Sequence, residues 1–237
     1  MLDPKIWQRF SVVLCALGGL GFFSPEGSAY ARPSSIALQL RSEKQIAVGP
    51  SCRSQTGDLI CLGLRYVVYE DDQGRALLTP SEVIKNLRAI NQSWSSCGIQ
   101  FQVDEYWSIF PEKMGLNLFP ANESELPEIR NAFLSDSQLL VVTTQSWNRD
   151  GSLGHTAANA WTSLPGEVPY GVVMEDSVGA FPNLIAHELG HYLNLLHVED
   201  QQNLMNPVIY TDSFALDSQQ CEEARGAAHQ FWKKMMS

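Results

Sequence analysis

Residues 187–197 of this chain read HELGHYLNLLH, and residues 203–207 read NLMNP. The sequence is largely apolar from Phe181 onward, so we predict a helix through the first half of this stretch. On a helix that turns by about 100° per residue, His187 and His191 lie on one face, one turn apart, and both imidazoles can reach one ion. Glu188 lies beside them, where a carboxylate can accept a proton from a zinc-bound water instead of binding the metal.

A third histidine, His197, makes this pattern more specific. If the helix continued, His197 would lie about 120° around the axis from His191 and could not share its ion. The chain must therefore turn, and Asn194 suits that turn because Asn, after Gly, is the residue that most readily adopts the left-handed conformation. Three neutral imidazoles leave one zinc position open for water, as in catalytic sites. We predict one catalytic Zn²⁺ held by His187, His191 and His197.

The motif HELGHYLNLLH, with the methionine of NLMNP downstream, resembles that of the metzincin zinc metallopeptidases, especially the matrixin and reprolysin branches. Asn194 stands where these families usually have Gly. The resemblance implies that Met205 is the Met-turn residue beneath the zinc; the alternative is an ordinary core methionine. It also implies an α/β catalytic domain with a twisted mixed sheet, one antiparallel edge strand, an active-site helix and a C-terminal helix.

Residues 151–161 (GSLGHTAANAW) contain several small side chains. Such residues allow another backbone to come close, as it must when a peptide pairs with an edge strand. The resemblance assigns four residues to a rim that binds the substrate main chain: Gly154, His155, Thr156 and Ala157. An ordinary strand or loop containing Gly is the alternative.

The segment after the Met-turn would wall the pocket beyond the scissile bond. By the same resemblance, Ile209 and Tyr210 in this segment would contact substrate, and their side chains suggest an apolar preference.

The N-terminus has the pattern of an export signal. Lys5 and Arg9 precede an apolar run over residues 10–23, and Ala29-Tyr30-Ala31 offers a small-residue cleavage site. The run is shorter than the roughly 20 residues that span a bilayer, so we expect no stable membrane insertion after cleavage. We predict a signal peptide over residues 1–31, an N-terminal extension or short propeptide over 32–57, and the catalytic domain over 58–237. The expected location is secreted or periplasmic.

Four cysteines follow the predicted signal: Cys52, Cys61, Cys97 and Cys221. An even number in an exported protein predicts two disulfides, for which three pairings are possible. We favour Cys52 with Cys61, which closes a short loop, and Cys97 with Cys221, which joins distant helices. The alternative is a free cysteine near the N-terminus that occupies the open zinc position and keeps an enzyme latent.

The hydrophobic pattern predicts alternating strands and helices. Strands are expected over residues 62–69, 99–107, 138–144 and 170–175, and helices over 80–97, 126–133, from about 181, and 217–234. Thr79 is the expected N-cap of the first helix, Glu82 completes its capping box, and Gly98 ends it.

The formal net charge of −10, without a basic stripe, argues against nucleic acid as a partner. The resemblance implies a zinc endopeptidase that acts on protein or peptide, with Glu188 as the general base, and we expect it to be secreted and monomeric. Two alternatives remain: a zinc hydrolase of a specialised non-protein or cell-wall peptide substrate, and a catalytically silent exported binding module. Glu188 argues against the second, because a metal-binding module does not need it.

Overall fold

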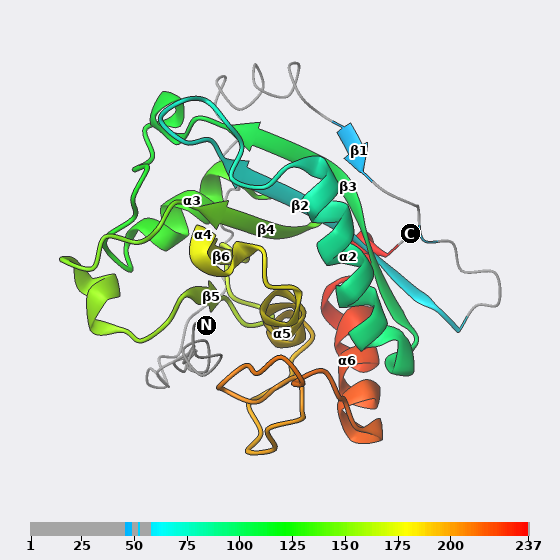
Figure 1. The fold of residues 1–237 in the computed structure, drawn as a ribbon. Coiled ribbons are helices and arrows are strands. Elements are labelled where there is room, and N and C mark those ends of the chain that lie inside the picture. Colours follow the sequence, from blue (N-terminus) through cyan, green and yellow to red (C-terminus); the bar gives the residue numbers. More distant parts are fainter. Residues whose placement is uncertain (1–45, 49–51, 53–57, 237) are drawn as a thin grey trace, which may run out of the picture.

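The computed structural model describes residues 46–48, 52 and 58–236, which form a sheet with helices on both faces (Figure 1). The predicted signal peptide and most of the predicted N-terminal extension lie outside the described residues. None of the helices within the described ranges is long and apolar enough to cross a membrane.

Within the described residues the sheet has six strands, in the order β1-β3-β2-β4-β6-β5. Strands β2, β3, β4 and β6 run parallel, and the edge strands β1 and β5 are antiparallel to their neighbours. The predicted mixed sheet with an antiparallel edge is confirmed, and β1 adds a second antiparallel edge that the sequence did not predict. The strands are β1 (Ile46–Val48), β2 (Ile60–Tyr69), β3 (Ile99–Ile109), β4 (Leu139–Thr144), β5 (Ala160–Thr162) and β6 (Val172–Glu175).

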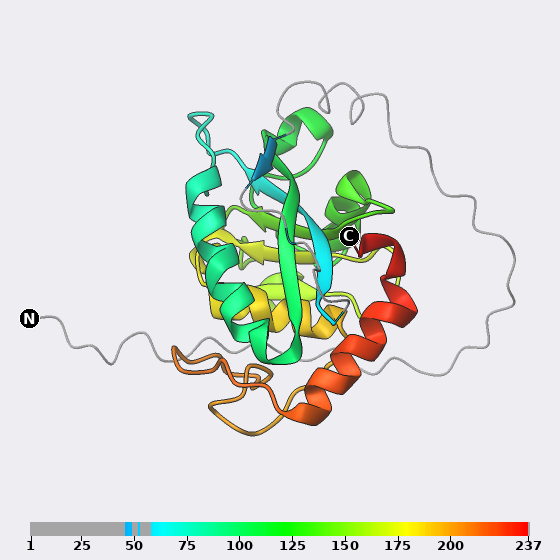
Figure 2. The same cartoon turned by 90° about the vertical axis from the view of Figure 1, so that its right-hand side faces the viewer.

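Two hydrophobic cores lie on the two faces of this sheet. On one face, α2 (Pro80–Trp94) and α5 (Pro182–Tyr192) pack side by side, and α6 (Ser218–Phe231) adds to the same core (Figures 1 and 2). On the other face, α3 (Glu125–Phe133) forms the second core. Strand β2 contributes to both cores and is buried along its whole length, so its residues are apolar almost without alternation. The shorter helices are α4 (Asp176–Gly179), η2 (Ser95–Cys97), η3 (Pro111–Met114), η4 (Ser152–His155) and η5 (Lys233–Met235).

Local signals fix the ends of the helices as predicted. Thr79 caps α2 with Glu82 as its capping-box partner, and Gly98 ends the following turn η2 with a φ of 62°. Helix α6 has a capping box of its own, made by Asp217 and Gln220. Both favoured disulfides are confirmed: Cys52 pairs with Cys61, and Cys97 pairs with Cys221.

Candidate metal centre

The active-site helix α5 ends in a turn that brings the third histidine back toward the first two. His187 and His191 lie on α5, and Asn194 takes the left-handed conformation, with a φ of 66°, as expected. The turn is held by backbone bonds, since the carbonyl of Gly190 accepts from the N–H of Leu193 at 2.9 Å and of Leu195 at 3.0 Å. Asn194 also donates through Nδ2 to Glu223 Oε1 on α6, at 2.9 Å.

The three predicted ligands converge on one point. The Nε2 atoms of His187 and His191 are 3.1 Å apart, and each lies 3.2 Å from Nε2 of His197. A tetrahedral zinc bonded to nitrogen at about 2.0–2.1 Å needs ligand atoms about 3.3 Å apart, so the triangle matches the ion. Among the described residues, these three histidines are the one group of potential metal ligands that lie this close together.

Hydrogen bonds at Nδ1 of His187 and His191 make the triangle of Nε2 atoms suitable for a cation. His187 Nδ1 donates to the carbonyl of Leu204 at 2.7 Å, and His191 Nδ1 donates to the carbonyl of Leu195 at 2.8 Å. A carbonyl can only accept, so the ring proton of each neutral imidazole lies on Nδ1 and its lone pair on Nε2. Lone pairs that face one another at this distance repel unless a positive charge lies between them, and the residues therefore fit a zinc ion.

The electrostatics of the histidines agree with this interpretation. Burial lowers the pKa of His187 and of His191, and burial together with the neighbouring His191 lowers the pKa of His197 to about 4. All three rings are therefore neutral near pH 7, which is the form that binds a metal.

Glu188 lies beside the triangle and is almost completely buried, at 1 % exposure. Its Oε2 accepts a hydrogen bond from the hydroxyl of Thr162 on β5. Its Oε1 has no hydrogen-bond partner among the described residues. Burial raises the pKa of Glu188 to about 7, against the opposing effects of the Thr162 hydroxyl and the charge of Arg130. A carboxyl group with one fixed and one available oxygen can accept and release a proton.

Met205 packs directly against α5. A Cβ placed on Gly190 would lie 2.4 Å from Met205 Sδ, and Met205 is fully buried. Gly190 is thus the small residue that lets the methionine approach the helix between His187 and His191. The role of Met205 as the Met-turn residue beneath a zinc stays a prediction.

Residues 151–161 form a turn followed by the start of a short strand. Ser152–His155 form the turn η4, and the edge strand β5 begins only at Ala160. Leu153 packs in the core on the face of the sheet opposite α5. Gly154, His155, Thr156 and Ala157 therefore lie outside the edge strand β5, and their contact with substrate stays a prediction.

The structure gives a local reason for the glycine at position 154. A Cβ on Gly154 would lie 1.7 Å from the carbonyl oxygen of Arg149, so Gly154 allows close packing within its own loop. Thr156 likewise donates its hydroxyl to the carbonyl of Leu153.

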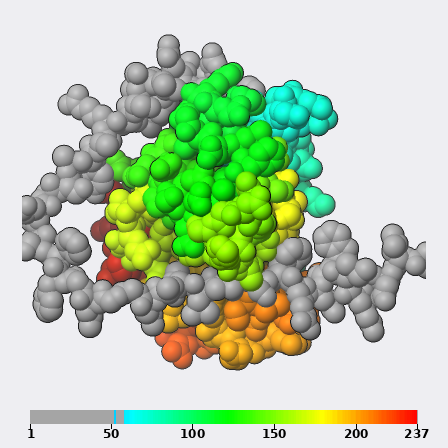
Figure 3. Space-filling model, turned by 90° about the vertical axis from the view of Figure 1, so that its left-hand side faces the viewer, coloured from blue at the N-terminus to red at the C-terminus, as the bar shows by residue number. Residues whose placement is uncertain are grey.

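The segment after the Met-turn lies against the start of α5, where Asn183 donates to the carbonyls of Tyr210 and Thr211. Ile209 is buried in the core, whereas Tyr210 is partly exposed. Of these two predicted pocket residues, the structure leaves Tyr210 more accessible. In the space-filling view, the surface between α5 and α6 (orange) lies below the green surface of residues that follow β3 (Figure 3).

Sequence reasoning missed Thr162, Asn203 and Gln220. A threonine in a strand and two polar residues near a turn are common, and only the spacing Asp217-x-x-Gln220 offered a signal, that of a capping box. Their roles depend on contacts between distant segments.

The family model described as Matrixin matches residues 80–225, which is more than half of the chain. The chain belongs to the matrixin family. This membership, with the three converging histidines, supports a zinc metallopeptidase.

A solved structure of low identity shares the fold. Metalloproteinase-II from Bacteroides fragilis matches with a TM-score of 0.50 and 14 % identity over 81 % of this chain and 60 % of that chain. This protein thus spans less than two thirds of that relative's length. Archaemetzincin from Methanopyrus kandleri matches with a TM-score of 0.48 and 14 % identity, over 75 % of this chain and 100 % of that chain. No curated protein gives a significant match.

Proposed function

We propose that this matrixin is an exported zinc endopeptidase that hydrolyses peptide bonds with Glu188 as the general base. The observation that carries the proposal is the triangle of three Nε2 atoms, 3.1–3.2 Å apart, next to a buried glutamate. His187, His191 and His197 would hold the ion. When bound, zinc would lower the pKa of a water ligand and polarise the carbonyl of the scissile bond.

The chain's own residues supply the proton transfer. The Thr162 hydroxyl holds Oε2 of Glu188, which leaves Oε1 to take a proton from the attacking water. The same carboxyl group then gives that proton to the nitrogen of the leaving amine. Because Glu188 is buried, bulk water cannot easily compete for this proton.

Strand β5 would bind the substrate backbone. It is the last strand of the sheet in the described part of the chain, so its outer edge can pair with an extended peptide. It also carries Thr162, which contacts Glu188. A peptide on this edge would therefore lie near the general base, and Tyr210 would contact it from the segment after the Met-turn.

The proposal of export rests on the signal pattern of residues 1–31, and the disulfides support it. Two disulfides are expected in an oxidising compartment outside the cytoplasm. We propose cleavage after Ala31, a catalytic domain over residues 58–237, a secreted or periplasmic location, and a monomer.

The test is digestion of a proteome-derived peptide library by residues 32–237, with the zinc content measured in the same sample. Glu188→Ala is the decisive variant, and Glu199→Ala, which removes an exposed carboxylate close in sequence, is its matched control. We expect one zinc per chain in all three proteins, and cleavage in all except Glu188→Ala. Undiminished cleavage by Glu188→Ala would refute the assigned base. One bound zinc without any cleavage would contradict a general endopeptidase and favour a specialised substrate.

A further inference from the structure

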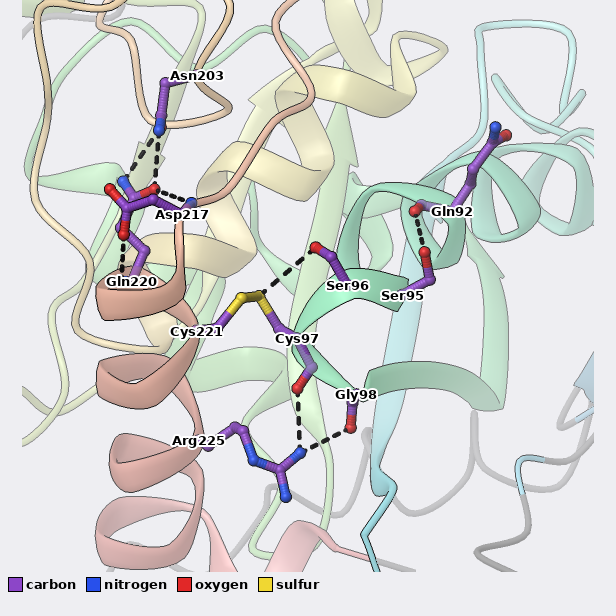
Figure 4. Close-up of a disulfide and its surroundings, with 10 residues drawn as sticks. All are labelled: Gln92, Ser95, Ser96, Cys97, Gly98, Asn203, Asp217, Gln220, Cys221 and Arg225. Carbon is purple, nitrogen blue, oxygen red and sulfur yellow. Dashed lines mark hydrogen bonds between the residues drawn. A yellow bond between two sulfur atoms is a disulfide. The ribbon is translucent and has the colours of Figure 1, made fainter.

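The turn at residues 203–207, called the Met-turn below because it carries Met205, is joined to α6 by two buried amide side chains, those of Asn203 and Gln220. Asn203 donates through Nδ2 to Gln220 Oε1 at 2.8 Å, and Gln220 donates through Nε2 to Asn203 Oδ1 at 3.1 Å (Figure 4). Asn203 is 6 % exposed and Gln220 is 7 % exposed. A reciprocal pair of this kind satisfies the polar atoms of both buried side chains.

Further hydrogen bonds fix the orientation of both amides. Asn203 Oδ1 also accepts from the backbone N–H of Met205 at 2.8 Å, so the amide of Asn203 cannot turn over without losing that bond. Gln220 Oε1 also accepts from the N–H of Asp217 at 3.0 Å, and Asp217 Oδ1 accepts from the N–H of Gln220 at 2.8 Å. Gln220 therefore caps α6 and holds the Met-turn with the same side chain.

The first turns of α6 are anchored to another part of the molecule. The Cys97–Cys221 disulfide joins the residue after Gln220 to the end of η2, below α2 (Figure 4). Arg225, one turn further along, donates to the carbonyls of Cys97 at 3.0 Å and Gly98 at 3.1 Å. Gln220 thus projects from a fixed support.

The Met-turn also forms hydrogen bonds with His187 and with Val198, the residue next to His197. The carbonyl of Leu204, the residue after Asn203, accepts from His187 Nδ1 at 2.7 Å. The carbonyl of Met205 accepts from the N–H of Val198, the residue after His197, at 3.0 Å. A displacement of the turn would change the orientation of the first ligand and the position of the third.

We propose that Asn203 and Gln220 are positioning residues that set the affinity of the site for zinc. The proposal rests on the zinc ligand set given above. Loss of Gln220 would take away the partner of the buried Asn203 Nδ2 and one of the two donors to Asn203 Oδ1, so the Leu204 carbonyl would be held less firmly. Partners that orient a ligand typically change metal affinity by about 10- to 100-fold, and we expect about tenfold for a residue one contact further away.

The experiment measures zinc affinity by competition with a chromophoric chelator, and it needs no substrate. Gln220→Ala should bind zinc about tenfold more weakly than wild type. Gln220→Glu is the milder variant, because it keeps an acceptor for Asp217 N–H and Asn203 Nδ2 but places an oxygen against Asn203 Oδ1. It should keep α6 capped and still weaken zinc binding, which covers the case in which the alanine variant does not fold.

Asn91→Ala is the matched control. Asn91 also makes two amide hydrogen bonds, with Phe101 O at 2.9 Å and Phe101 N at 2.7 Å, and none of these bonds involves the Met-turn. It should lower the unfolding temperature without changing zinc affinity. The effects of Asn203→Ala and Gln220→Ala on affinity should be far from additive in the double variant, because they break the same contact.

Equal zinc affinity in wild type and in folded Gln220→Glu would overturn the inference, and so would an equal loss of affinity in Asn91→Ala. A wild-type protein that binds no zinc would instead refute the proposed ligand set. The two failures are therefore distinguishable.

Discussion

The neighbouring residues His187 and Glu188 are held by different regions of the molecule. His187 is oriented by the Leu204 carbonyl in the Met-turn, which the amide pair ties to α6. Glu188 is held by the hydroxyl of Thr162 on β5, at the edge of the sheet. The comparison teaches that the proposed metal ligand and the proposed general base are held by separate supports, although the two residues are adjacent in sequence. A substitution in one support should therefore leave the function of the other support unchanged.

We expect the largest effect, a loss of zinc binding, from removal of one of the three proposed zinc ligands. His197→Ala should weaken zinc binding by more than about 100-fold, beyond the effect of an outer partner, and abolish peptide cleavage. Measurement of bound zinc after dialysis tests this, with His229→Ala, an exposed histidine on α6, as the control. Full zinc occupancy in His197→Ala would remove that residue from the ligand set.

The anchor of α6 should matter more than the other disulfide. Cys97→Ser with Cys221→Ser opens a loop of 124 residues, whereas Cys52→Ser with Cys61→Ser opens one of 9. Loop entropy predicts that the first pair lowers the free energy of unfolding by about 5 kcal/mol and the second by about 2.5 kcal/mol. Chemical denaturation gives both values. We also expect weaker zinc binding for the first pair alone; an equal loss for both pairs would contradict a special role for the α6 anchor.

The contact between α5 and Met205 should be tight enough to exclude a methyl group. Gly190→Ala places a Cβ 2.4 Å from Met205 Sδ, whereas Gly226→Ala, on α6, meets no atom within 4 Å. We expect Gly190→Ala to lower the free energy of unfolding by about 1–2 kcal/mol, after its gain in helix propensity. Gly226→Ala should raise it by up to about 1 kcal/mol. Thermal unfolding of the two variants gives the comparison, and a stabilised Gly190→Ala would show that Met205 moves aside freely.

We expect the smallest of these effects from removal of the hydroxyl that holds the proposed general base. Thr162→Val removes the hydroxyl that holds Glu188, and it should lower kcat about tenfold with little change in KM or zinc content. Thr162→Ser should restore most of kcat. The control is Ser163→Ala, since the Ser163 hydroxyl is equally buried but donates to the carbonyl of Pro169. A loss of zinc in Thr162→Val would mean that the two supports are not separate.

The sequence could predict the chemical residues of the site but not the two supports that hold them. The role of Met205 was implied only by the resemblance, whereas the histidines, Glu188 and the turn at Asn194 follow from helical spacing and from side chains with specific chemistry. The same holds for the cap at Thr79 and for both cysteine pairs. In each case the signal lies in a few neighbouring residues or in a residue type with few roles.

Small residues have several uses, so they do not by themselves identify a rim that binds substrate. Gly154 avoids the carbonyl of Arg149 inside a tight turn, and nothing in its neighbours separates that use from close approach of a substrate. The three-residue strand β5 is too short to show a period of two. Thr162 and Gln220 contact Glu188 and Asn203, which lie far from them in sequence, so these contacts are visible only in the folded structure.

The turn at Asn194 has a consequence for the thermodynamics of metal uptake. Its left-handed backbone, the two bonds to the Gly190 carbonyl and the contact with Glu223 are all made by the protein itself. The conformational entropy of bringing His197 back to the helix is therefore lost during folding and not during zinc binding. An Asn in place of a Gly also has fewer conformations in the unfolded chain, which reduces that loss. Zinc should consequently bind to a largely organised site, with a small change in heat capacity.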